Sequence, residues 1–172
     1  MTRTTARQIA VQLLFSVDDS QASIDEVRDL FFSEEHFSSL AEEDPMFRET
    51  PDQTQIDYIC RLTDAVRSHT EELNEIINRY ARGWKLERLS KATRTILRCA
   101  LAEILYLADV PAGAAVNEAV ELGKRFDSED AASFINGILG AYLRSTDTDE
   151  ESLRTDGADL PGGEKASPAA ES

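Results

Sequence analysis

The chain has 172 residues, of which 41% are hydrophobic, and a formal net charge of -15 at pH 7. These apolar residues suffice for one sizeable core. The two cysteines, Cys60 and Cys99, are too few for a disulfide framework and indicate reduced thiols. Met1 to Arg7 is polar and lacks the apolar segment of a secretory signal, so we expect a cytoplasmic protein.

The negative charge is concentrated in two segments. Residues 18–57 carry a net charge of -11 and residues 145–172 a net charge of -6. Residues 1–17, in contrast, carry +2, and residues 58–144 are neutral. A locally basic surface is compatible with this distribution, so the acidic total does not exclude nucleic-acid binding.

The first third of the chain contains two amphipathic patterns. Apolar residues at helical spacing predict one helix from about Thr5 to Val17 and another from about Ile24. Residues 33–52 contain two prolines and mixed polarity, and here we expect a long connection with one helical turn. Its expected anchors are Phe37, Leu40 and Phe47.

A third helix is predicted to begin sharply, with Thr50 as the N-cap and Pro51 in the first helical position. Its apolar pattern continues to Tyr80, with a break near Ser68, and Gly83 is the expected stop.

Residues 93–110 form the expected centre of the fold. Only two charges, Arg98 and Glu103, occur between Ile96 and Ala108. A helix that is apolar on nearly all sides is normally covered by its neighbours. A buried strand is the alternative, but the length and the many Ala and Leu residues favour a helix that starts after Ser90 and stops before Pro111.

Two further helices are predicted, one up to about Phe126 and one from about Ser128. Within them, Asn117 and Asn136 would need hydrogen-bond partners if buried, and Gly137 indicates a close helix contact. After Arg144 the composition becomes acidic and poor in apolar residues, as in disordered segments. The sequence thus predicts an all-α domain over residues 1–144 and a disordered acidic tail over residues 145–172.

Catalytic and metal-binding patterns are weak in this sequence. His36, His69, Cys60 and Cys99 are scattered without metal-ligand spacing, and we expect no metal ion and no cofactor. The more informative feature is a series of seven basic residues between Arg79 and Arg98, with Trp84 among them. Such a series is typical of a surface that binds a phosphate backbone, but also of charges that are spread around a solvated helix. The spacing alone does not distinguish between these two interpretations.

Residues 83–139 resemble the C-terminal half of the NusB family of transcription antitermination factors. The resemblance rests on ILRCALAE from Ile96, DVP at Asp109, NEAVEL from Asn117, and SED followed by FINGIL. The opening ARQIAVQLLFS resembles the family's first helix. The resemblance to this family implies about seven helices in two packed helical subdomains and no enzymatic activity.

The resemblance also implies a function. Members of this family bind boxA RNA together with NusE, a ribosomal small-subunit protein, in the antitermination complex of RNA polymerase on ribosomal RNA operons. By match to the family, the expected RNA-binding residues are Arg3, Arg7, Phe15, Lys124 and Phe126. The expected NusE-binding residues are Asp130 and Phe134.

The sequence departs from the family at the N-terminus, where the usual arginine run is reduced to Arg3 and Arg7. A second hypothesis therefore stays open: a helical interaction module, monomeric or homodimeric, that has kept the fold and weakened or lost RNA binding.

Overall fold

The computed structural model describes residues 1–81 and 88–158, with side chains except at 19 and 148–158. This part contains eight α-helices, one 3₁₀-helix and no strand, which confirms the all-α class. The helices are α1 (Arg3–Asp19), α2 (Ile24–Phe31), α3 (Glu34–Glu43), η1 (Pro45–Arg48), α4 (Gln53–Ser68), α5 (Thr70–Tyr80), α6 (Lys91–Tyr106), α7 (Ala112–Phe126) and α8 (Glu129–Ala158).

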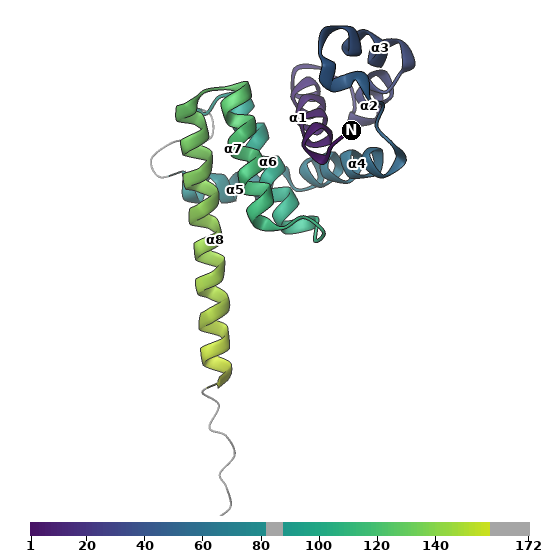
Figure 1. Cartoon of the computed structure of the whole chain (residues 1–172). Coiled ribbons are helices and arrows are strands. Elements are labelled where there is room, and N and C mark those ends of the chain that lie inside the picture. The colour runs from purple at the N-terminus through teal and green to yellow at the C-terminus, as the bar shows by residue number, and fades with distance from the viewer. Residues whose placement is uncertain (82–87, 159–172) are drawn as a thin grey trace, which may run out of the picture.

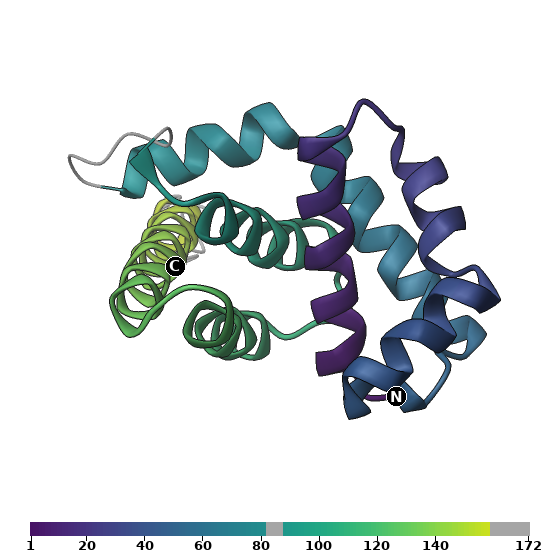
Figure 2. The same ribbon diagram turned by 90° about the horizontal axis from the view of Figure 1, so that it is seen from above.

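The helices form two packed groups (Figures 1 and 2). One group contains α1 to α4 and the other contains α5 to α8. Helix α6 joins them, because it contacts α5, α7 and α8 on one side and α1 and α4 on the other. The side chains of Ile96, Leu97 and Leu101 on α6 are at most 1% exposed, so the predicted central position of this helix is confirmed.

Polar side chains cap the starts of α1, α2, α3, α4 and α6. Thr2, Ser23, Ser33 and Ser90 each accept a hydrogen bond from a backbone N–H in the first turn of the helix that follows. The cap of α4 is Asp52, which exchanges hydrogen bonds with Gln55 in a capping box. The predicted start at Thr50 and Pro51 is therefore wrong by two residues. The predicted break near Ser68 is confirmed, since α4 ends there and α5 begins at Thr70.

The expectation of a long connection over residues 33–52 is wrong. This segment contains the ten-residue helix α3 and the short helix η1. Ser33 caps α3, and the Phe37 ring lies edge-on between those of Phe31 and Phe47, with centroids 6.1 Å from each. Such aromatic pairs add to the apolar burial, and the pair with Phe31 holds this acidic segment against α2.

Helix α8 begins where expected, after Ser128, and continues past Arg144 to Ala158. Regular structure thus extends beyond the expected domain boundary, while residues 159–172 lie outside the described part. No proline or glycine interrupts residues 145–156, and extending an anchored helix costs much less than nucleating one. Neither α8 nor any other described helix is long and apolar enough to cross a membrane. The expected stop at Gly83, like Trp84, also lies outside the described residues.

Helix α7 packs closely on α8 at Gly123. A Cβ atom added to Gly123 would lie 2.8 Å from Cδ1 of Ile135 and 3.2 Å from Cα of Ala132. Gly137, where we expected the close contact, has no atom within 4 Å of such a Cβ, so that expectation is wrong. Asn117 and Asn136 are exposed and need no buried partner.

This difference predicts opposite effects of alanine at the two glycines. Gly137→Ala should raise the free energy of unfolding by roughly 0.5–1 kcal/mol, because alanine is the better helix former and has room here. Gly123→Ala should be less stable than Gly137→Ala by about 1–3 kcal/mol, because the added methyl group overpacks the contact. Urea unfolding of both variants measures this, and equal stabilities would contradict the described packing.

Candidate nucleic-acid and partner interfaces

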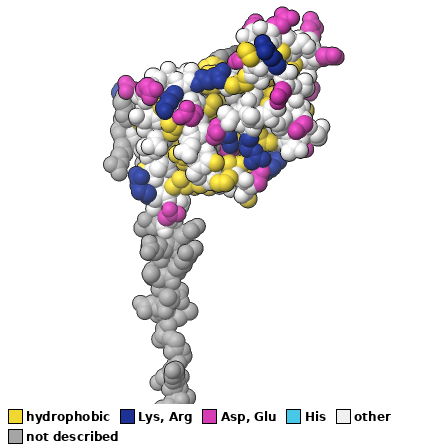
Figure 3. Space-filling view, viewed as in Figure 1, with side chains coloured by type: hydrophobic (Ala, Val, Ile, Leu, Met, Phe, Trp, Pro, Cys, Tyr) yellow, Lys and Arg dark blue, Asp and Glu magenta, His cyan; other side chains and the backbone are white. Residues whose placement is uncertain are grey.

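The two N-terminal arginines lie one turn apart on α1 but in different environments. The Arg3 side chain is 46% exposed, and its Nη2 lies 3.5 Å from Oδ2 of Asp109. Its guanidinium also stacks over the Tyr58 ring, 4.9 Å from the centroid. Arg3 therefore presents positive charge at the surface, close to Arg61 of α4, whose Nη2 lies 2.8 Å from Oδ1 of the same Asp109. Figure 3 shows Lys and Arg side chains gathered on one part of this face of the molecule.

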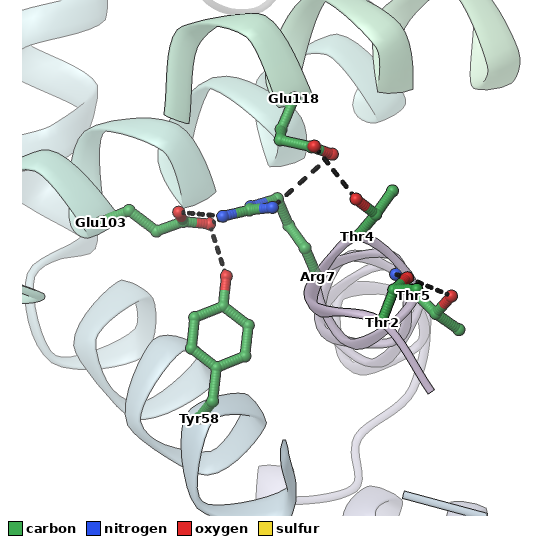
Figure 4. A network of polar contacts seen from close by, with 7 residues as sticks. All are labelled: Thr2, Thr4, Thr5, Arg7, Tyr58, Glu103 and Glu118. Atoms are coloured by element: carbon green, nitrogen blue, oxygen red, sulfur yellow. Dashed lines mark hydrogen bonds and ion pairs between the residues drawn. The ribbon is translucent and has the colours of Figure 1, made fainter. Parts of the chain in front are cut away.

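Arg7 points into the interior, where it is 4% exposed (Figure 4). Its Nε and Nη2 donate hydrogen bonds of 2.6 and 2.7 Å to the two carboxylate oxygens of Glu103, which is fully buried on α6. The Tyr58 hydroxyl donates to the same carboxylate at 2.8 Å, and Nη1 of Arg7 lies 3.6 Å from Glu118. These four side chains join α1, α4, α6 and α7.

Burial disfavours the charged form of Arg7, but the hydrogen bonds and negative charge of Glu103 outweigh it and raise the pKa of the guanidinium above its ordinary value. Burial and the same carboxylate raise the pKa of the Tyr58 hydroxyl as well. Arg7 is thus a permanent charge that is committed to Glu103. The expectation that Arg7 contacts RNA is not supported by this geometry, and Arg7 instead holds α1 against α6.

Phe15 and Phe126, which are far apart in sequence, line the same groove. Its volume is about 440 Å³, and α1, α2, α3, α6 and α7 all contribute to it. Phe15 is 37% exposed, and Nζ of Lys91 lies 4.1 Å from its ring centroid. The guanidinium of Arg125 lies 5.9 Å from the Phe126 centroid. The groove therefore combines aromatic walls with two neighbouring cations.

Sequence reasoning missed three other residues that line this groove. They are His36 and Leu40 of α3 and Gln12 of α1. Helix α3 had a detectable signal in Ser33 followed by two acidic residues, which is a favourable helix start. The two prolines downstream suggested a loop instead.

The remaining expected RNA-binding residue, Lys124, is exposed on α7, and its Nζ lies 3.3 Å from Glu121. Arg3 lies twelve residues before Phe15, or about 18 Å along α1. The expected RNA-binding residues therefore do not form one cluster. Arg3 lies at the start of α1, whereas Phe15 and Phe126 line the groove.

The basic series between Arg79 and Arg98 does not form one continuous track in the described part of the chain. Arg79 and Arg88 are exposed, whereas Arg98 donates a 2.8 Å hydrogen bond to Asn74 and burial lowers its pKa. Arg82 and Lys85 lie outside the described residues. Lys91 is the member that reaches the groove.

Asp130 and Phe134 on α8 line a second hollow of about 370 Å³, together with Ser90, Thr93 and Asp127. Asp130 is exposed and Phe134 is half-buried. Hydrogen bonds from Ser90 and Thr93 lower the pKa of Asp127 and tie the start of α6 to the turn before α8. The two expected partner-binding residues therefore share one surface.

Comparison with known proteins agrees with this architecture. The NusB family model matches residues 4–144. Transcription antitermination protein NusB of Thermoanaerobacter sp. (strain X514) is 34% identical over 150 residues, which cover 87% of this chain and 96% of that protein. The protein of the same name from Symbiobacterium thermophilum is 37% identical over 152 residues, covering 84% and 90%.

A crystal structure of the antitermination factors NusB and NusE in complex with dsRNA superimposes with a TM-score of 0.65. Sequence identity is 26%, and the match covers 83% of this chain and 96% of that one. A match over nearly the whole helical domain, in both sequence and fold, identifies the family. The chain belongs to the NusB family.

Proposed function

We propose that the chain is a transcription antitermination factor that binds boxA-type RNA together with NusE, as part of the RNA polymerase complex that transcribes ribosomal RNA operons. The observation that carries this proposal is the likeness of the whole helical domain to NusB in the solved complex with NusE and dsRNA. The proposed function is binding, and we assign no catalytic residue. A cytoplasmic location, where transcription takes place in bacteria, is part of the proposal.

Within this function we assign RNA contacts to Arg3, Phe15, Lys124 and Phe126. Arg3 and Lys124 supply charge for phosphates, and the two aromatic rings supply stacking surface. Arg7 positions the helix that carries Arg3 and Phe15.

The salt dependence of RNA binding tests the role of Arg3. Each phosphate contact on single-stranded RNA contributes about -0.7 to the slope of log K against log salt concentration. Arg3→Ala should therefore flatten this slope by about 0.7. Arg48→Ala removes the same charge from an exposed position on η1 and serves as the control, with an unchanged slope. Equal slopes for Arg3→Ala and the wild type would contradict the assignment.

We assign NusE binding to the hollow that contains Asp130 and Phe134. An exposed carboxylate beside a half-buried aromatic ring suits a small interface anchor with a polar rim. Phe134→Ala should weaken NusE binding by at least about 1 kcal/mol, with little change in melting temperature. Asp130→Asn should weaken it with normal folding, whereas Asp147→Asn, farther along the same helix, should not.

Two results would refute this assignment. One is full NusE affinity of the Asp130→Asn variant. The other is a loss of about 3–5 kcal/mol of folding stability in Phe134→Ala with unchanged NusE affinity, which would make Phe134 a core residue only.

The second candidate function is a helical interaction module, monomeric or homodimeric, with weakened RNA binding. The burial of Arg7 favours it, because Arg3 is then the only exposed arginine in the first turns of α1. RNA binding with the predicted salt slope, and with a higher affinity in the presence of NusE, would reject this alternative.

A further inference from the structure

We propose that the groove between α1, α3 and α7 seats one unpaired base of the RNA, and that Gln12 and His36 contact the edge of that base. This inference rests on the proposed RNA-binding function and assigns it a base-recognition site. It adds Gln12 and His36 to the binding residues and gives α3 a part in recognition.

The walls of the groove suit a base. The rings of Phe15, Phe31 and Phe126 line it, and its volume is about 440 Å³. Proteins that recognise single-stranded RNA stack unpaired bases on aromatic side chains, whereas bases in a duplex are not accessible in this way. Phe15 keeps 37% of its surface exposed beside this hollow, so it offers a stacking face without rearrangement of the core.

The polar groups of the groove are available for a ligand. The side-chain amide of Gln12 and the ring nitrogens of His36 make no hydrogen bond to any described residue. The Ser16 hydroxyl, in contrast, is committed to the carbonyl oxygen of Gln12. An amide presents donors and an acceptor side by side, and an imidazole presents a further polar edge, which are the groups that read the edges of bases. An apolar lining with a few convergent polar groups is typical of a specific ligand site.

Two cations beside the aromatic rings favour RNA over an apolar protein segment. Lys91 lies over Phe15 and Arg125 lies beside Phe126, so cations flank two of the aromatic rings. Asp44 lies 3.2 Å from Arg125 and offsets part of its charge. Phosphates on either side of a seated base would experience the positive charge of these residues.

The inference is tested with the full chain, NusE and boxA-type RNAs that lack a single base, one position at a time. Fluorescence anisotropy gives the affinity of each RNA for the wild type and for Gln12→Ala and His36→Ala. Gln21→Ala and His69→Ala are the matched controls, since both residues lie outside the groove. Melting temperatures show that each variant is folded.

One abasic position should weaken wild-type binding roughly tenfold. The same position should cost clearly less than tenfold in the Gln12→Ala and His36→Ala variants, because each variant has already lost one edge contact of that base and keeps only its stacking on the aromatic rings and the other edge contact. These variants should keep the wild-type salt slope, since base contacts release no counterions. The control variants should bind like the wild type.

Three outcomes would overturn the base site while leaving RNA binding established. In the first, each abasic RNA loses the same factor in affinity for the wild type and for the variants. In the second, the variants bind intact RNA as tightly as the wild type does. In the third, the variants lose affinity for NusE but not for RNA. The last result would make the groove a protein-binding site. Failure of the wild type to bind boxA-type RNA in the presence of NusE would instead refute the proposed function.

Discussion

Replacing Arg7 with alanine should lower the free energy of unfolding by about 3–5 kcal/mol. The substitution leaves the carboxyl group of Glu103 fully buried and without both hydrogen bonds from the guanidinium. Tyr58 would remain as a single donor at 2.8 Å, which cannot replace the lost charge. Chemical denaturation followed by circular dichroism measures the effect.

Two further variants separate the ion pair from simple packing. Arg7→Lys keeps the charge but not the two parallel donors, so its stability should lie between those of the wild type and Arg7→Ala. Arg7→Met combined with Glu103→Leu removes both charges and should be clearly more stable than Arg7→Ala. A loss below about 1 kcal/mol in Arg7→Ala would contradict the buried ion pair.

The same variant separates structural from RNA-binding roles. Under conditions where Arg7→Ala is folded, it should keep the salt slope of the wild type, because the buried guanidinium releases no counterions on binding. Arg3→Ala should show the opposite pattern, with near-normal stability and a flatter slope.

Leu101→Ala should destabilise the fold by about 2–5 kcal/mol, because it opens a cavity in the central helix. Leu101 has no exposed surface and lies on α6, which both helix groups contact. Leu105→Ala on the same helix is the matched control, since Leu105 is 36% exposed and its loss should cost far less. Equal losses at the two positions would mean that α6 is not the centre of the core.

Much of the helical architecture follows from the sequence. Apolar spacing predicted α1, α2, α6 and α7 to within a few residues, because these helices bury one or more regular faces. Helix α3 was not predicted. Its stability depends on edge-to-face contacts of Phe37 with Phe31 and Phe47, and such tertiary contacts do not show in a local pattern.

The binding surfaces were predictable only in part. The family resemblance indicated Phe15 and Phe126 as two separate RNA-binding residues. It did not indicate that they line one groove, to which α3 also contributes. Arg7 was assigned to RNA because it stands in an N-terminal arginine pattern. Its partner Glu103 is 96 residues away, and no local pattern indicates that pairing. This long-range ion pair keeps Arg7 in the interior, whereas Arg3 reaches the surface.

The most direct test of the proposed function is a titration of the full chain against boxA-type RNA, with and without NusE, at one fixed salt concentration. Because linked equilibria are reciprocal, NusE should raise the affinity for RNA by the same factor by which RNA raises the affinity for NusE. An RNA of unrelated sequence should show weaker binding and a smaller effect of NusE. Equal affinities for the two RNAs, unaffected by NusE, would contradict an antitermination function of this chain.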